Sequence, residues 1–365
     1  MTILILNWRD IKNPAGGGAE LLTHELAKRW VKSGHNVIQF SATFPKGKKE
    51  EIIDGVKIIR RGQWWSVQFF AFFYYQFILQ KKIDIIIDEV HWFPFFSVLY
   101  APQKTVAFVC EVANKLFYTI FPYPIAAGWR VLEKMYLSLY KNVPTMAISQ
   151  STKEDLLVEG HNSSNIIVIP MGLTTPAKIK HFPKEKLPTV IYVARLNRQK
   201  GIFEALDAFV LVKNQLPEAK LWIVGSGQSE VLSELKRKIK EDNLNKSVTL
   251  FGFVSQEKKF ELLSRAHLLI SASVQEGWGL TVPEAGLTRT PSVVYNIQGF
   301  RDIIENKKDG LLVERNPDAL AQGILKVLNN KELYKKMQSA SERKAKSYSW
   351  ETSSKAALQF LQKHD

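Results

Sequence analysis

Residues 188–227 read PTVIYVARLNRQKGIFEALDAFVLVKNQLPEAKLWIVGSG, and this stretch decides the fold. The apolar run 188–196 predicts a strand, residues 201–215 predict a helix, and residues 219–227 predict a second strand. Strands that alternate with helices pair in parallel, because the helix carries the chain back to the end of the sheet where the first strand began. The stretch therefore predicts an α/β unit built on a parallel sheet.

The same alternation continues on the C-terminal side of this stretch. Leu232, Leu235 and Ile239 recur at helical spacing, which predicts a helix over residues 230–241. Further strands are expected at 247–254, 267–273, 290–296 and 310–314, with a helix at 256–266.

A second α/β half precedes this one. Strands are expected at 2–8, 36–42 and 83–91, and a helix from residue 19 to residue 33 is terminated by Gly34. Residues 174–188 are rich in Pro, Thr and Lys and are typical of a connection between domains. We therefore predict two Rossmann-like, doubly wound domains, residues 1–172 and 173–347. Such domains are expected to face each other across a cleft that binds the ligand, because the carboxyl ends of their strands line it.

Composition restricts the classes of partner. The chain of 365 residues has a formal net charge of +15 and one cysteine, Cys110, which excludes an internal disulfide and fits a reducing cytosol. The positive charge is spread out, with no basic stripe interleaved with aromatics, no zinc-ligand spacing and no helix-turn-helix pattern, so we predict no nucleic-acid partner. The opening run MTILIL is too short for a secretory signal, which predicts a cytoplasmic protein.

The most apolar stretch, WWSVQFFAFFYYQFIL, covers residues 64–79. A membrane-spanning helix needs about 20 apolar residues. This stretch is shorter and contains Ser66, Gln68 and Gln76, so we predict that it does not span a membrane.

A glycine-rich segment, NPAGGGAE, follows the first expected strand. Gly16, Gly17 and Gly18 expose backbone N–H groups at the start of a helix, an arrangement that suits an anion. The alternative is a loop that needs positive φ angles. The segment is not a dinucleotide-binding fingerprint, and GSGQSE at 225–230 lacks the third glycine of that fingerprint.

Two cations, Arg195 and Lys200, stand between the strand and the helix of the opening stretch. At the carboxyl end of a strand they point toward the expected cleft. A guanidinium and an ammonium together can hold a diphosphate and neutralise it as it leaves. The alternative is that both side chains are solvated at the surface.

The stretch QEGWGLTVPEA, residues 275–285, carries two glutamates. Pro283 suits the first turn of a helix, so the N–H groups of residues 279–281 are expected just ahead of that helix, where they can bind a phosphate. Glutamates are poor phosphate ligands, which makes sugar hydroxyls the natural partners of Glu276 and a ribose diol that of Glu284. Alternatively, an acidic residue there only favours the helix dipole.

These segments together resemble a known family. EGWGLTVPE is similar to the E-x7-E motif of the retaining glycosyltransferases of family 4 (glycosyl transferases group 1), which have the GT-B fold. ARLNRQKG resembles that family's R-x4-K element, and NPAGGGAE resembles its N-terminal glycine loop. GLLVERNPDALAQGI resembles its late strand and helix, and SYSWETSSKAALQFL its closing helix. The resemblance covers the chain in the family's order and implies that this closing helix, at about 348–365, crosses back onto the N-terminal domain.

The resemblance implies a role for each matching residue on the donor side. Residues Gly16, Gly17 and Gly18 approach the donor's phosphate or sugar through their backbone, and Arg195 and Lys200 hold its diphosphate. Glu276 binds the donor sugar and Glu284 the ribose. The loop residues Gly277, Trp278, Gly279, Leu280 and Thr281 contribute backbone contacts, and Phe253 and Val254 line the base pocket by position.

On the acceptor side, His91 ends the expected strand 83–91, where many family members have a histidine near the donor sugar and the acceptor. A lone histidine can equally be structural. Glu111 departs from the family pattern, which often has a histidine just after the next strand. This departure weakens the transfer of acceptor-side roles to this chain.

The implied reaction moves a hexose from a UDP- or GDP-linked sugar to a hydroxyl acceptor with retention of configuration. The sequence has no D-x-D spacing in residues 84–91, so neither a metal nor another cofactor is expected. Two alternatives stay open: a non-catalytic subunit that binds a nucleotide sugar, and a sugar-nucleotide epimerase of similar fold.

In a GT-B enzyme the N-terminal domain receives the acceptor, which the resemblance implies is a lipid-linked precursor or a polysaccharide or glycoconjugate precursor. Aromatic residues dominate segments 64–77 and 116–141, and Arg130, Lys134 and Lys141 accompany the second. An aromatic and basic surface suits an anionic membrane interface. This favours a peripheral protein on the inner face of the cytoplasmic membrane; the alternative is that the helices bury these aromatics against their sheet.

Overall fold

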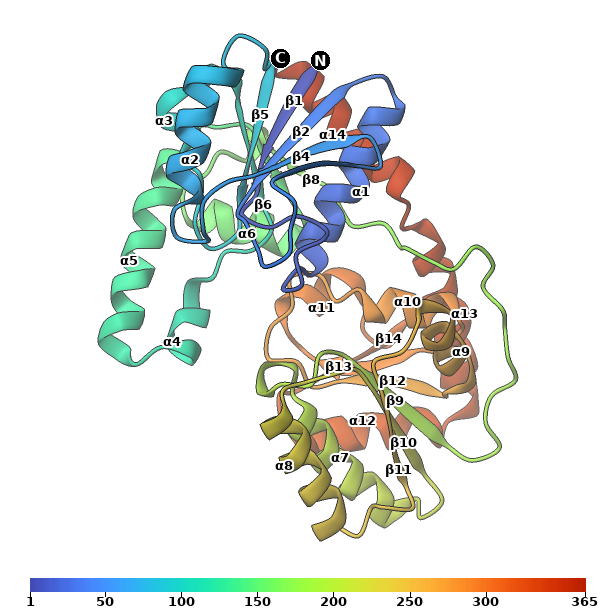
Figure 1. Cartoon of the computed structure of the whole chain (residues 1–365). Helices are drawn as coiled ribbons and strands as arrows, with labels where there is room; N and C mark the ends of the chain where they lie inside the picture. Colours follow the sequence, from blue (N-terminus) through green and yellow to red (C-terminus); the bar gives the residue numbers. More distant parts are fainter. The chain divides into compact units, whose positions relative to one another are not determined.

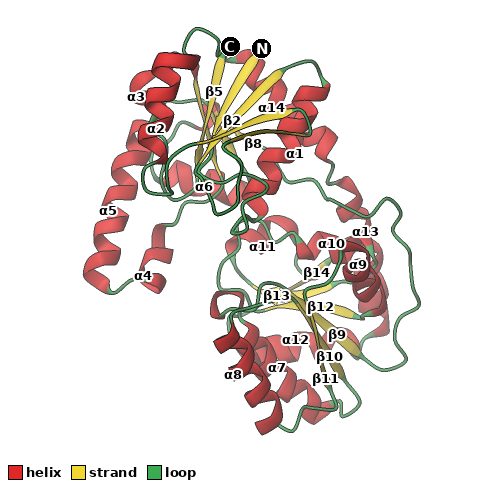
Figure 2. Cartoon of the chain, in the orientation of Figure 1, coloured by secondary structure: helices red, strands yellow, loops and turns green.

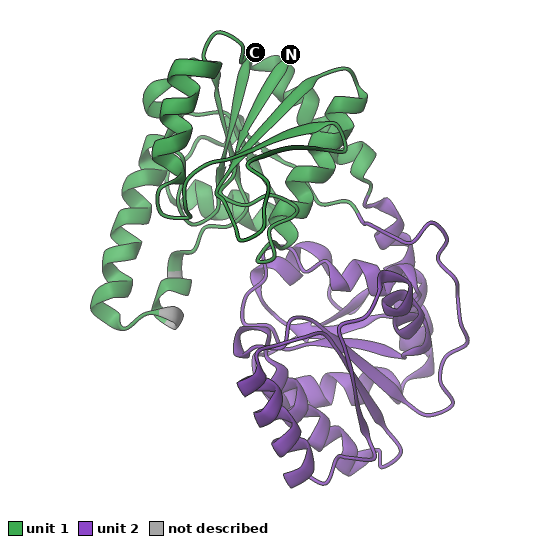
Figure 3. Cartoon of the chain, viewed as in Figure 1, with its two compact units in different colours: residues 1–172, 349–365 green, residues 173–348 purple. Residues whose placement is uncertain are grey.

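The computed structural model of the chain describes residues 1–114, 116–118 and 121–365. The chain folds into two compact units (Figure 3). Unit 1 comprises residues 1–172 and 349–365, and unit 2 comprises residues 173–348. Each unit is an α/β body around a largely parallel sheet, so the prediction of two doubly wound domains is confirmed (Figure 2).

The sheet of unit 1 has eight strands in the order β3-β4-β2-β1-β5-β6-β7-β8. All neighbours pair in parallel except β3 and β4, which are antiparallel at the edge. The six residues of β5 are all buried, as expected for a strand covered on both faces. The strands are β1 (Thr2–Leu6), β2 (Asn36–Ser41), β3 (Glu50–Ile53), β4 (Val56–Arg60), β5 (Ile85–Val90), β6 (Thr105–Val109), β7 (Thr145–Ala147) and β8 (Ile166–Val168).

Helices cover both faces of this sheet. Figure 1 shows α2, α3 and α5 on one face and α1 with α14 on the other. The helices are α1 (Gly18–Lys32), α2 (Val67–Tyr74), α3 (Ser97–Tyr100), α4 (Phe117–Ile120), α5 (Tyr123–Leu139), α6 (Gln150–Val158) and α14 (Trp350–Lys363), with a π-helical turn η1 (Tyr75–Leu79) and 3-10 turns η2 (Pro102–Lys104), η3 (Asn114–Leu116) and η4 (Ser163–Asn165).

Helix α14 belongs to unit 1 although it ends the chain. The indole Nε1 of Trp30 in α1 donates to the carbonyl of Ser354 at 3.1 Å, and the Ser353 hydroxyl donates to the carbonyl of Pro170 at 2.6 Å. A side chain at Gly172 would collide with the backbone of Trp350, since a Cβ there would lie 2.3 Å from its nitrogen. The closing helix is therefore held by α1 and by the last residues before unit 2.

The sheet of unit 2 has six parallel strands in the order β11-β10-β9-β12-β13-β14. Figure 1 shows α7, α8 and α12 on one face and α9, α10 and α13 on the other. The strands are β9 (Thr189–Val193), β10 (Lys220–Val224), β11 (Val248–Gly252), β12 (Leu268–Ser271), β13 (Ser292–Tyr295) and β14 (Gly310–Val313). The helices are η5 (Arg198–Lys200), α7 (Ile202–Gln215), α8 (Ser229–Glu241), α9 (Gln256–Arg265), α10 (Thr281–Leu287), α11 (Gln298–Ile303), α12 (Pro317–Leu328) and α13 (Lys331–Ser347).

Both sheets reverse direction once. In unit 1 the chain fills the sheet from β1 toward β2 and then resumes with β5 on the other side of β1. In unit 2 it fills from β9 toward β11 and resumes with β12 on the other side of β9. Ligands of such folds bind outside the carboxyl ends of the strands at this switch point, because the loops diverge there and leave space.

Residues 67–79 of the apolar stretch 64–79 form α2 and the π-helical turn η1. None of the helices in the described ranges has the length and apolar character that crossing a bilayer requires.

Candidate active site

The switch point of unit 2 brings two predicted loops together. One loop follows β9 and runs through η5 into α7; the other follows β12 and runs into α10. Gly201, at φ +69°, lies so close to the second loop that a Cβ would be 2.0 Å from the carbonyl oxygen of Ala272. The Val274 N–H also donates to the carbonyl of Gln199 at 3.0 Å. Only glycine allows this approach, so the two loops form one surface.

Lys200 and Glu276 meet on this surface. The Lys200 Nζ lies 2.7 Å from Oε1 of Glu276, and both side chains are partly exposed. The backbone beneath Lys200 is held independently of its side chain, since its N–H donates to Asn197 Oδ1 at 2.9 Å and its carbonyl accepts from the Tyr192 hydroxyl at 2.8 Å. The ammonium is therefore free to exchange its carboxylate partner for a ligand.

Next to this ion pair lies a run of unpaired backbone donors. In the described ranges, the N–H groups of Gly277, Trp278, Gly279 and Leu280 donate to no acceptor. Gly279 adopts φ +77°, a conformation that favours glycine, and α10 begins two residues later. Thr281 is the first residue of that helix. A cation beside four free N–H groups is suited to a phosphate group.

The side chain of Trp278 serves packing instead. It is buried, and its ring meets that of Tyr348 edge-on with centroids 4.8 Å apart. Any contact that Trp278 makes with a ligand therefore falls to its backbone.

The other predicted cation, Arg195, is exposed and forms no ion pair with the part of the chain that the structure describes. Its neighbour Arg198 is engaged by Glu234, with Nη2 2.7 Å from Oε2. Arg195 is therefore unpaired and available to a ligand, whereas Arg198 already has a carboxylate partner.

Glu284 lies deeper than the sequence suggests. Its side chain is buried, and its Oε1 accepts from the Nζ of Lys259 at 2.6 Å. Burial raises the pKa of Glu284 and the Lys259 ammonium opposes that rise. Its buried Oε2 has no hydrogen-bond partner in the described ranges, so one carboxylate oxygen still lacks a donor.

Two predicted base-pocket residues follow β11. Phe253 is 84% exposed, and Val254 comes directly after it. Ser255 then caps α9, whose first turns carry Lys259. The exposed ring of Phe253 and the ammonium of Lys259, which pairs with Glu284, are thus only six positions apart in the chain.

In unit 1 the glycine loop uses most of its own donors. The Gly16 N–H donates to the carbonyl of Asn13 at 2.8 Å, and the Gly17 N–H donates to Oε2 of Glu20 at 2.6 Å. Gly18 begins α1, and its N–H donates to no acceptor within the described ranges. Of the three glycines, only Gly18 offers a free backbone donor to an anion.

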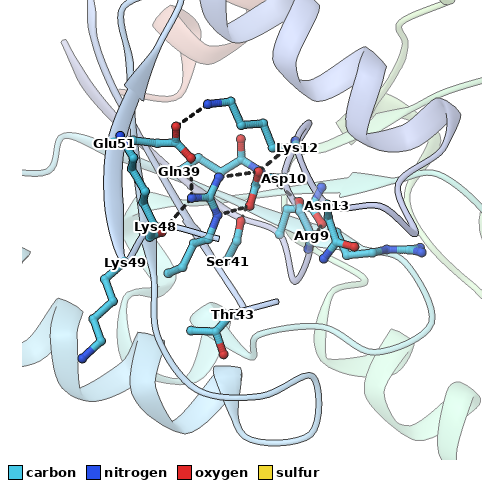
Figure 4. A network of polar contacts seen from close by, with 12 residues as sticks. Arg9, Asp10, Lys12, Asn13, Gln39, Ser41, Thr43, Lys48, Lys49 and Glu51 are labelled. Carbon is cyan, nitrogen blue, oxygen red and sulfur yellow. Dashed lines mark hydrogen bonds and ion pairs between the residues drawn. The ribbon is translucent and has the colours of Figure 1, made fainter. Parts of the chain in front are cut away.

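Charged side chains hold this loop in place. Arg9 donates from Nη1 to the carbonyl of Ala15 at 2.6 Å and lies 2.9 Å from Oε1 of Glu20. Asp10, which follows, is fully buried with Arg60 at the end of β4, and the two form a bidentate pair at 2.6 and 2.7 Å (Figure 4). The conformation of the loop is therefore set before any ligand arrives.

His91 follows β5 at the switch point of unit 1. Its ring meets that of Trp8 edge-on at 6.4 Å, and its buried Nδ1 has no hydrogen-bond partner in the described ranges. Burial lowers the pKa of His91, although the negative charge of Glu20 opposes this. The imidazole is thus neutral at pH 7 and can accept a hydrogen bond.

Sequence reasoning missed three residues around these sites. Lys259 pairs with Glu284, and Glu20 fixes the glycine loop. Glu89 is fully buried, and its Oε2 accepts from Asn7 Nδ2 at 2.7 Å and from the Thr23 hydroxyl at 2.6 Å. Burial raises the pKa of Glu89 to about 8. Only Glu89 carried a readable signal, because it and Asp88 are acidic residues inside the otherwise apolar strand IIIDEV.

The described residues contain no group of three or more His, Cys, Asp or Glu side chains arranged to hold a metal ion. The absence of a metal requirement stays a prediction.

Two family descriptions match the chain, one on each side of the unit boundary. Residues 16–175 match glycosyltransferase family 4, and residues 175–344 match glycosyl transferases group 1.

Curated relatives are distant. A poly(glycerol-phosphate) alpha-glucosyltransferase of Bacillus subtilis is 28% identical over 222 residues, which cover 60% of this chain and 32% of that protein. An alpha-1,3/1,6-mannosyltransferase of Rhizomucor pusillus is 24% identical over 395 residues, which cover 89% of this chain and 84% of that protein. The chain spans about half or less of the length of several other relatives. In a poly(ribitol-phosphate) alpha-N-acetylglucosaminyltransferase of Staphylococcus aureus, the match covers 36% of that protein's length.

Solved structures share the fold over the whole chain. A sucrose-phosphate synthase from Thermosynechococcus elongatus superposes with a TM-score of 0.79 at 18% identity, covering 99% of this chain and 98% of that one. The Anabaena protein HepE in complex with UDP and glucose gives a TM-score of 0.73 at 17% identity, covering 100% of both. With its GT-B fold and its two family matches, the chain belongs to the family 4 glycosyltransferases, glycosyl transferases group 1.

Proposed function

We propose that this protein transfers a hexose from a UDP- or GDP-linked sugar to a hydroxyl acceptor, with retention of configuration and without a metal or other cofactor. The observation that carries the proposal is the Lys200–Glu276 ion pair at 2.7 Å, placed beside four unpaired N–H groups at a switch point. It is supported by the family membership of the chain and by the complex of HepE with UDP and glucose.

The ion pair suggests how the donor binds. The diphosphate displaces Glu276 from Lys200 and takes over the ammonium, with Arg195 and the N–H groups of residues 277–280 completing the anion site. Glu276, released from Lys200, accepts hydrogen bonds from hydroxyls of the donor sugar. Lys200 and Glu276 thus bind each other in the absence of the donor. When the donor is present, Lys200 binds its diphosphate and Glu276 binds its sugar.

The chemical step needs stabilisation of the leaving group. The bond between the anomeric carbon and the diphosphate oxygen breaks, and Lys200 with the backbone donors stabilises the charge that develops on that oxygen. The acceptor hydroxyl attacks on the same face, and the departing phosphate oxygen takes its proton. Neutral His91 accepts a hydrogen bond from a sugar hydroxyl, because its pKa is lowered by burial.

Nucleoside recognition falls to three residues of unit 2. The free Oε2 of Glu284 accepts from the ribose diol, and the exposed ring of Phe253 with Val254 stacks on the base.

For the acceptor we propose a lipid-linked precursor, or a polysaccharide or glycoconjugate precursor, met at the inner face of the cytoplasmic membrane. Exposed aromatic side chains on unit 1 support this choice.

Ligand binding gives the first test. In a thermal-shift panel of UDP- and GDP-sugars, the correct donor at 100 times its Kd stabilises the folded state by about 2.7 kcal/mol. For a unit of this size, that raises the Tm by roughly 5 to 10 °C. The assay also identifies the base and the sugar of the donor.

Product analysis separates the rival functions. A transferase releases nucleoside diphosphate, and faster when the acceptor is present, whereas an epimerase changes the sugar without releasing it and a binding subunit does neither. A panel with no thermal shift and no diphosphate release from any donor would overturn the proposal.

Lys259 allows a pH test of the ribose contact. In Lys259→Met the pKa of Glu284 rises further, because burial raises it and the opposing ammonium is gone. A larger fraction of Glu284 is then protonated at a given pH, and the neutral carboxyl is a weaker acceptor for the diol than the carboxylate. We expect calorimetric affinity for the nucleoside diphosphate to increase from pH 6 to pH 9 in the variant more steeply than in the wild type.

Lys259→Arg is the matched control, because it keeps the charge and should restore the wild-type pH profile. A loss of affinity that is equal at every pH would mean that Lys259 touches the nucleotide itself and does not act through Glu284.

A further inference from the structure

Unit 1 exposes an unusual number of large apolar side chains on one helical layer. We call this surface the aromatic face and define it by Trp64, Trp65, Phe69, Phe73 and Phe77 before and along α2 and η1, Leu99 on α3, and Ile125, Trp129, Val131, Met135 and Leu139 on α5. Trp64, Phe69 and Phe77 are 68%, 69% and 78% exposed. Patches of this kind mark sites of interaction.

The three helices form one layer. Ile86 and Val90 lie four residues apart on β5 and therefore point to the same face of the sheet. Ile86 belongs to the core beneath α2, and Val90 to the core beneath α5. Tyr100 of α3 touches α2, with its ring 5.2 Å from that of Phe72. Figures 1 and 2 show α2, α3 and α5 side by side on this face.

Packing against the sheet does not account for the exposed rings. Val67, Ala71 and Tyr75 recur at intervals of four residues and bury the inner side of α2 and η1. Phe69, Phe73 and Phe77 recur at the same interval on the outer side, where Phe73 and Phe77 stack with ring centroids 6.2 Å apart. A helix that is apolar on both sides needs a second apolar environment.

Charge identifies that environment. The sequence from Arg61 to Lys82 contains no Asp or Glu, and its last two residues, Lys81 and Lys82, are exposed. On α5 the one acidic residue, Glu133, is buried and accepts N–H groups of the chain. The aromatic face is thus bordered by cations without exposed acids on these helices.

We propose that the aromatic face docks on an anionic lipid bilayer, with the rings of Trp64, Trp65 and Phe77 at headgroup depth and the lysines on lipid phosphates. Aromatic rings prefer the membrane interface, and each lysine near an anionic surface adds attraction. A symmetric contact with a second copy would bring the same lysine borders together and is disfavoured. The proposal deepens the membrane part of the proposed function, and vesicle binding without donor or acceptor tests it separately from the transfer reaction.

The test is co-sedimentation of the full chain with two kinds of vesicle, one of phosphatidylcholine alone and one of phosphatidylcholine with phosphatidylglycerol. We expect binding to the anionic vesicles that weakens with salt. Phe77→Ser should weaken binding on the order of tenfold, the effect of withdrawing one large side chain from an apolar contact. Replacing Lys81 and Lys82 with Gln should weaken binding to the anionic vesicles only, by roughly fivefold per lysine.

Val158→Ser is the matched control, because Val158 is 80% exposed on α6, outside the aromatic face, and its loss should leave binding unchanged. Melting curves of all variants check that each is folded. Absence of wild-type binding to both vesicles would overturn the proposal, as would equal binding by Phe77→Ser. A dimer in lipid-free solution that Phe77→Ser dissociates, together with no vesicle binding, would assign the face to a second copy instead.

Discussion

Replacing Lys200 with alanine is expected to lower the rate of sugar transfer by on the order of 100- to 1000-fold while the protein stays folded. Loss of a preorganised group that stabilises developing charge has an effect of this size. The fold should survive because the loop is held by Asn197, by Tyr192 and by the Val274 N–H, none of which contacts the ammonium. The measurement is steady-state release of nucleoside diphosphate in the presence of acceptor.

Arg198→Ala is the control for this prediction. Arg198 lies two residues away, but its guanidinium is exposed and engaged by Glu234. Its loss should change the rate little, because its guanidinium pairs with Glu234 and is not part of the proposed diphosphate site. If Lys200→Ala retained activity within about threefold of the wild type, Lys200 could not be the group that stabilises the leaving diphosphate.

The second large effect is expected on stability. Replacing Asp10 with alanine should lower the free energy of unfolding by about 3 to 5 kcal/mol, because it leaves the fully buried Arg60 guanidinium without its bidentate partner. Glu51, 2.6 Å from Arg60 Nη1, compensates only in part because it approaches a different nitrogen. Urea unfolding followed by circular dichroism measures the loss.

Two further variants make this prediction specific. The double replacement of Asp10 by Ala and Arg60 by Met should recover much of the loss, because it removes both buried charges at once. Arg61→Ala, which breaks the partly exposed pair of Arg61 with Glu50, should cost no more than about 1 kcal/mol. If Asp10→Ala and Arg61→Ala lowered the free energy of unfolding equally, burial of the Asp10–Arg60 pair would not increase its contribution to stability.

Local sequence patterns were enough for most of the fold. The opening stretch predicts β9, α7 and β10 within a few residues, because apolar periodicity and the glycine stops are local properties. The antiparallel hairpin of β3 and β4 was missed, although its turn was readable. Asp54 and Gly55 have φ angles of +49° and +84°, the conformation that an Asp-Gly pair favours between two strands.

The candidate site was predictable in its composition but not in its pairing. Motif spacing brought Lys200 and Glu276 to adjacent loops, yet nothing in the sequence says that they bind each other. Glu284 and Lys259 lie 25 positions apart, and Lys259 belongs to a helix whose function no motif marks. The N–H groups of Gly16 and Gly17 likewise looked free, because their acceptors are set by the loop conformation. Which donors are already satisfied is a property of the folded chain.

The return of α14 to unit 1 has a consequence for biosynthesis. Residues 1–172 leave the ribosome first, but Trp30 finds its carbonyl partner on Ser354 only after all of unit 2 has been translated. At about 5 to 20 residues per second, the nascent first unit waits roughly 10 to 35 seconds with the docking side of α1 uncovered. During that interval the nascent first unit is a natural substrate for chaperones. A fragment of residues 1–172 produced alone should aggregate unless a peptide with the sequence of α14 is added.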